Sequence, residues 1–153
     1  NYYVSKRVEE EKPDIIIVGI REGIMPFNNS ILNDFGEDAF VISHALSIDY
    51  SVMDVYYNEY LEKEFLLYVA KLLKYQFNSE MLALGVSNTY CEFTAESFGK
   101  KAKYYHLDLD EQFTPKYRME SFVDTFQVHS QTELQKIAQK TMDLFIDNVA
   151  VVI

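Results

Sequence analysis

The feature that most constrains the fold is an uninterrupted apolar run near the start of the chain. Pro13 is followed by Asp14-Ile-Ile-Ile-Val-Gly-Ile20, in which five of seven residues are β-branched. A half-exposed strand alternates apolar and polar residues, whereas a strand covered on both faces is continuously apolar. The run therefore predicts an interior strand of a parallel sheet over residues 14–20. A helix over residues 2–12 precedes it, and the proline ends that helix.

The rest of the chain alternates between helical and strand patterns, which is typical of α/β proteins. Ser130 and Glu133 have the spacing of a capping box that opens the last helix. Residues 149–153 fit either a final strand or a frayed end. We expect a three-layer α/β fold with an open, mostly parallel sheet of about five strands and helices on both faces. The further helices are expected over 30–46, 59–77 and from 130 onward, and the further strands over 51–57, 81–86, 102–107 and 122–128.

The chain has 153 residues and no linker or internal repeat, which predicts a single α/β domain over residues 1–153. It opens on Asn1 without an initiating Met, so we expect it to be the C-terminal part of a longer protein.

The helix expected over residues 59–77 has apolar residues on more than one side. Apolar patches beyond a few hundred Å² are seldom left exposed on monomers. We therefore expect a second element of the chain, or a second copy in a homodimer, to cover the wider side. The main stripe is Leu61, Phe65, Tyr68, Val69 and Leu72, and the wider side is Leu66, Leu67 and Leu73.

The formal net charge of −10, with 14 scattered basic residues, argues against nucleic-acid partners and against anionic membrane surfaces. No apolar run reaches the length of a membrane span. A single Cys excludes an internal disulfide and favours the reducing cytoplasm. The chain has 12 Tyr and 11 Phe without Trp. Tyr joins an apolar ring to a polar tip, so it suits half-buried positions and interfaces.

Two segments are candidates for a site because they follow apolar strands at the edge where open α/β sheets bind ligands. One is the loop 19–29, and the other is the loop 85–93. Arg21 would anchor an anionic group, and Asn88 would orient the ligand through its amide. The alternative for Arg21 is a surface ion pair. The candidate residues are Gly19, Arg21, Glu22, Gly23, Asn28, Asn29, Ser87, Asn88 and Cys91.

No known catalytic or cofactor motif occurs in these loops. The dinucleotide fingerprint and the P-loop are both absent, and no cofactor is indicated. Cys91 lacks a neighbouring base, and Glu92 beside it disfavours a thiolate, so a packed side chain is the preferred interpretation. His44, His106 and His129 have no metal-ligand spacing. We therefore assign no catalytic and no metal-binding residue.

Several tracts resemble bacterial peptide maturation system proteins, which accompany radical-SAM-type peptide modification cassettes. The resemblance covers most of the chain and implies a role in handling a ribosomal peptide. The family has a Pro-Gly pair where this chain has Arg21-Glu22, a departure that affects any glycine-dependent binding. The matching tracts are Lys12–Ile20, Gly23–Pro26, Asn33–Gly36, Lys74–Phe77 and Gly85–Asn88.

Two hypotheses for function follow. The first is an accessory domain of a peptide maturation or modification pathway that binds a partner protein or peptide. The second is a small-molecule or nucleotide-binding α/β domain, enzymatic or not, that uses the loops after the first and third strands.

Overall fold

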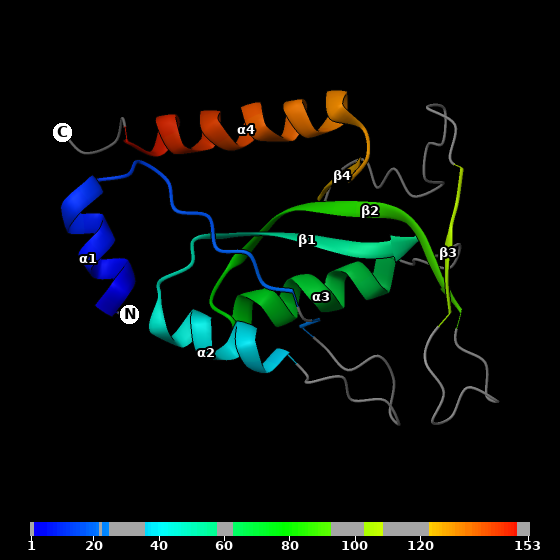
Figure 1. Cartoon of the computed structure of the whole chain (residues 1–153), viewed down its shortest axis with the longest axis horizontal. Coiled ribbons are helices and arrows are strands. Elements are labelled where there is room, and N and C mark those ends of the chain that lie inside the picture. The colour runs from blue at the N-terminus through cyan, green and yellow to red at the C-terminus, as the bar shows by residue number, and fades with distance from the viewer. Residues whose placement is uncertain are drawn as a thin grey trace.

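The chain folds as an α/β protein in the computed structural model shown in Figure 1. The structure describes residues 2–21, 23–24, 36–57, 63–92, 103–108 and 123–149. The elements within these ranges are α1 (Tyr2–Glu11), α2 (Glu37–Ala45), β1 (Tyr50–Tyr57), α3 (Lys63–Gln76), β2 (Glu80–Glu92), β3 (Lys103–His106), β4 (Asp124–Gln127) and α4 (Gln131–Val149).

The described strands form one open, mixed sheet with β2 at its centre. β1 pairs with β2 in parallel on one side, and β4 pairs with β2 in parallel on the other. β3 is antiparallel and pairs with the last part of β2, Cys91 opposite Tyr104. The expected α/β class and open sheet are confirmed, and the four strands expected over 51–57, 81–86, 102–107 and 122–128 are all present.

Helices lie on both sides of the sheet: α2 and α3 on one side and α4 on the other (Figure 1). The core is on the α3 side, where Val69, Leu73 and Phe77 pack with Ala39 of α2. Leu66 of α3 packs there against Leu84 of β2. α4 packs more loosely. None of its described side chains is fully buried, although Phe145 makes an edge-on contact with Tyr50.

Burial of α3 follows the prediction, and it includes residues of both expected sides: Val69 of the main stripe is fully buried. Leu66 and Leu73, placed on the wider side, are buried, while Tyr68 of the expected main stripe is 53% exposed. The sheet and α2 cover this side, so a second element of the same chain does so, and the homodimer stays a prediction. Leu61 lies outside the described residues.

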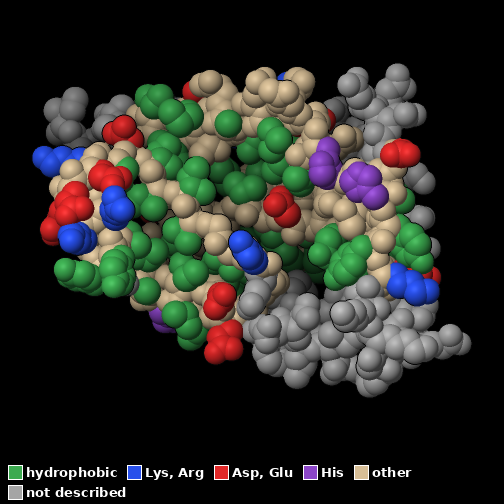
Figure 2. Space-filling view, viewed as in Figure 1, with side chains coloured by type: hydrophobic (Ala, Val, Ile, Leu, Met, Phe, Trp, Pro, Cys, Tyr) green, Lys and Arg blue, Asp and Glu red, His purple; other side chains and the backbone are tan. Residues whose placement is uncertain are grey.

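Residues 14–20 are not a strand, and the prediction of an interior strand there is wrong. The segment runs past β1 without pairing with it (Figure 1), and Ile17 is 91% exposed. Hydrophobic side chains also spread over much of the face in Figure 2. A β-branched run shows that its residues favour burial in a sheet. A strand also needs a neighbouring strand to pair with, and the local sequence does not determine whether one is present. The preceding helix α1 ends before Pro13 as expected.

Local chemistry explains two helix starts. Gly36 precedes α2 with φ of 76°, and a β-carbon there would lie 2.8 Å from the Ile24 backbone, so only glycine fits. The helix expected over 30–46 begins after this glycine, and residues 30–35 lie outside the described part. Before α4, the Glu133 N–H donates to Ser130 Oγ at 3.4 Å. The Glu133 carboxylate accepts instead from the Gln127 N–H at 2.6 Å, so half of the capping box forms.

Candidate functional site

The loop expected over residues 85–93 is strand from Gly85 to Glu92, and that prediction is wrong for those residues. Ser87, Asn88 and Cys91 therefore project from β2. The short polar side chains of this segment are typical of turns and therefore predicted a loop. Pairing of Thr89–Glu92 with β3 keeps the chain extended instead. The ladder with β1 is irregular here, between the pairs Val55–Val86 and Tyr57–Tyr90.

The first predicted loop lies only partly within the described residues. Gly19, Arg21 and Gly23 are exposed, and no contact among described residues joins Arg21 to Ser87, Asn88 or Cys91. Glu22, Asn28 and Asn29 lie outside that part of the chain. A ligand site shared between residues 19–29 and β2 stays a prediction.

Asn88, in the second half of β2, contacts His106, which in turn packs against His129. Its Nδ2 atom lies 2.9 Å from His106 Nε2 and donates to the Leu107 carbonyl at 3.3 Å. In this arrangement Nε2 accepts, which places the ring proton of neutral His106 on Nδ1. The His129 ring packs edge-on against His106 with centroids 5.9 Å apart. Asn88 Oδ1 is buried and has no hydrogen-bond partner among the described residues.

A second group of side chains lies on the β2–β3 ribbon, which we define as residues 88–92 with β3, and on the neighbouring end of β1. Tyr56 of β1 and Tyr104 of β3 have ring centroids 5.6 Å apart, and the Tyr104 hydroxyl hydrogen-bonds to Cys91. The rings of Tyr90 and Tyr105 are 6.4 Å apart, and the Tyr105 hydroxyl donates to Glu92 at 2.9 Å. All four rings are exposed, from 39% to 58%. No described helix packs along β3 (Figure 1).

The protonation of these groups favours binding over nucleophilic chemistry. Burial raises the pKa of the Cys91 thiol, and the hydrogen bond from Tyr104 opposes this only in part. Burial also raises the pKa of Tyr104, and the hydrogen bond to Glu92 raises that of Tyr105. The thiol and both phenols are therefore neutral at pH 7. A neutral thiol is a poor nucleophile, so Cys91 is a packing residue in this setting.

Asp54 of β1 lies against the bare backbone of Gly85. The two residues pair directly, and a β-carbon on Gly85 would lie 2.1 Å from Asp54 Oδ1. It would also lie 2.9 Å from Val128 Cγ2 and 3.0 Å from Phe126 Cζ. The carboxylate thus occupies space that only glycine leaves open, beside two apolar side chains. Burial there raises the pKa of Asp54.

Strand alternation places Asp54 and Tyr56 on the same face. Met53 and Val55 pack against the α3 side of the sheet, so Asp54 and Tyr56 project from the opposite side. We call Asp54, Tyr56 and Tyr104 the acid–tyrosine cluster. The prediction of a site missed all three, although alternation within the strand expected over 51–57 could have shown that Asp54 and Tyr56 share a face.

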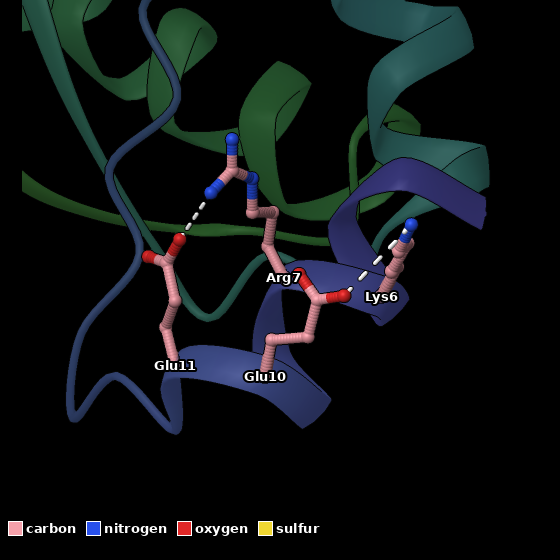
Figure 3. A network of polar contacts seen from close by, with 4 residues as sticks. All are labelled: Lys6, Arg7, Glu10 and Glu11. Atoms are coloured by element: carbon pink, nitrogen blue, oxygen red, sulfur yellow. Dashed lines mark hydrogen bonds and ion pairs between the residues drawn. The ribbon is translucent and has the colours of Figure 1, made fainter.

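The charged side chains of α1 form local pairs instead of a site. Lys6 lies 3.8 Å from Glu10, and Arg7 pairs with Glu11 one turn further on (Figure 3). Such exposed pairs four residues apart contribute about 0.3–0.5 kcal/mol. A shallow hollow beside them is lined by α1 alone, so we do not consider it a binding site.

The described ranges were also searched for metal-binding clusters and for membrane-spanning helices. No three His, Cys, Asp or Glu side chains lie close enough together there to hold a metal ion. None of the helices described is both long and apolar enough to cross a membrane.

Comparison of the chain with models of known protein families, with curated proteins and with solved structures finds no match. The resemblance to peptide maturation system proteins stays a prediction, and function has to be inferred from the geometry.

Proposed function

We propose that the chain is an accessory domain that binds a partner protein or peptide in a cytoplasmic peptide maturation or modification pathway. The observation that carries this proposal is the exposed ring pair formed by Tyr56 of β1 and Tyr104 of β3. The second exposed pair, Tyr90 and Tyr105, projects from the other face of the ribbon, because successive residues of a strand alternate. The sequence resemblance is what supports the pathway.

Exposed tyrosine pairs suit a protein interface for physical reasons. A Tyr ring contributes a large contact area with only two side-chain torsions to order, and its hydroxyl can bond to the partner. The rings at the ribbon are already held against one another, Tyr56 against Tyr104 and Tyr90 against Tyr105. This ordering lowers the entropy that binding would otherwise cost.

The test is selection of random displayed peptides against the folded chain. Enriched peptides should bind with dissociation constants on the order of micromolar. Tyr104→Ala and Tyr56→Ala should each weaken that binding at least about tenfold, the loss typical of a buried aromatic anchor. Tyr75→Ala is the matched control, because this ring on α3 is 79% exposed and lies outside the ribbon. Peptides that bind the Tyr104→Ala variant as tightly as the parent would contradict the proposal.

A second candidate is a small-molecule site at Asn88. It is favoured by the buried Asn88 Oδ1 atom, which has no hydrogen-bond partner among the described residues. This atom lies near His106 and just past the last β2–β4 pair, Val86–Gln127. A thermal-shift screen with nucleotides and common cofactors tests it. A ligand present at one hundred times its dissociation constant adds about 2.7 kcal/mol of stability. Asn88→Ala should remove a true shift.

A further inference from the structure

We propose that the acid–tyrosine cluster binds one cationic side chain of the partner, an arginine or a lysine, between the Asp54 carboxylate and the Tyr56–Tyr104 ring pair. This inference rests on the proposed function, because it names the chemistry that the tyrosine surface selects.

The carboxylate of Asp54 lacks a cation in the described part of the chain. None of the ion pairs or hydrogen bonds there involves it. It is exposed, so a cation can reach it from solvent, while one side of it lies against Gly85, with Phe126 and Val128 nearby. A carboxylate in partly apolar surroundings loses hydration and regains free energy when a cation donates to it.

The two rings lie at the right position to complete such a site. Tyr56 follows Asp54 by two residues on the same face of β1, about 6.6 Å along the strand. Tyr104 adds a second ring in contact with the first. A guanidinium or ammonium group that bonds to the carboxylate can therefore rest on a ring face within about 6 Å, the range of cation–π attraction.

The charge of the whole chain favours the same ligand. A formal net charge of −10 attracts a basic peptide and raises its rate of association. The sheet face then supplies a specific contact for one of that peptide's side chains. The partner class is thus a peptide or protein segment with an arginine or lysine beside residues that contact the tyrosines.

The experiment titrates the full chain with N-acetylarginine amide, N-acetyllysine amide and the neutral isostere N-acetylcitrulline amide, followed by NMR. The cationic probes should shift the signals of Asp54, Tyr56 and Tyr104 with dissociation constants on the order of 1 mM. Citrulline should bind at least about tenfold more weakly, because it cannot form the charged contact. A stronger response to arginine than to lysine would identify the ligand as a guanidinium.

The variants separate this site from general attraction to an acidic protein. Asp54→Asn should abolish the shifts, and Asp14→Asn, which removes an exposed carboxylate elsewhere, should leave them unchanged. Tyr104→Phe should keep binding, since the ring remains, and Tyr104→Ala should weaken it. Equal binding of citrulline and arginine, or unchanged binding to Asp54→Asn, would overturn the cation site.

Displayed peptides distinguish failure of this inference from failure of the proposed function. Enriched peptides that require Tyr104 but contain no arginine or lysine would overturn the cation site and leave the proposed function standing. Arginine binding that requires Asp54, without any peptide that requires Tyr104, would support the site and contradict the wider function.

Discussion

Gly85 is the residue whose replacement should disturb the sheet most directly. A methyl group there would meet Asp54, Phe126 and Val128 at 2.1, 3.0 and 2.9 Å, respectively. Since Phe126 is buried and cannot move outward freely, Gly85→Ala should lower the free energy of unfolding by about 2 kcal/mol. Urea denaturation followed by circular dichroism measures the change.

Gly19→Ala is the control, because a β-carbon at Gly19 has no heavy atom within 4 Å. Its free energy of unfolding should stay within about 0.5 kcal/mol of the parent. Equal stability of the two variants would show that Asp54 does not lie over Gly85 in solution.

Asp54 should make stability depend on pH. Its pKa in the folded chain is raised above the ordinary 3.8, so the folded state holds this proton more tightly than the unfolded state. The resulting stabilisation is fully present below about pH 3.8 and is lost as the pH rises through the folded-state pKa. Because Asp54 is exposed, solvent screens most of this effect. Asp54→Asn should therefore melt only slightly higher than the parent at pH 7, by at most about 1 °C, with the difference shrinking toward pH 3.

Thermal melts at several pH values, with Asp14→Asn as a reference, measure this difference. A lower melting temperature for Asp54→Asn at pH 7 would mean that the carboxylate has an ion-pair partner in the folded chain. The proposed cation site and a gain in stability on its removal have the same cause, a carboxylate held partly away from water.

At the scale of elements, α3 contributes more buried side chains to the core than any other described helix. Leu73 is 4% exposed and packs with Ala39, Val69 and Phe77. Leu73→Ala should lower the free energy of unfolding by about 2–4 kcal/mol, through lost burial and the cavity that remains. Tyr75→Ala, two residues further along the same helix, should change it by less than about 0.5 kcal/mol. Similar losses in the two variants would show that α3 does not pack on the sheet with this face.

The sequence predicted the helices and four strands because their periodicities differ and because Pro13 and Ser130 mark boundaries. It did not predict the extent of β2, because Asn88, Thr89 and Glu92 are typical of a turn. Residues 89–92 owe their extended conformation to pairing with β3. That pairing joins residues distant in sequence, which no local pattern contains.

The candidate site was predicted only in part for the same reason. Asn88 and Cys91 were recognised by residue type, and the structure places them on β2 near the end of the parallel strands. Asp54 and Tyr104 come from strands on either side of β2, and only the register brings them to one surface.

For the whole molecule, the run Ile15–Ile20, which is exposed from Ile16 onward, has a consequence for behaviour in concentrated solution. A short β-branched stretch without charge matches the composition of segments that stack into fibrils. β1, which pairs only with β2 among the described strands, is a free edge that such a stretch from another molecule could join. Self-association should therefore grow with concentration despite the net charge of −10.

Ile17→Lys should slow this association, because Ile17 is 91% exposed and a lysine there opposes stacking without loss of packing. Static light scattering and thioflavin fluorescence over a concentration series measure the effect, with Ile17→Val as the control that keeps the β-branched character. If both variants aggregate as the parent does, the run is not the nucleating segment. If only the Ile17→Lys variant stays monomeric, residues 15–20 determine the concentration at which the protein begins to aggregate.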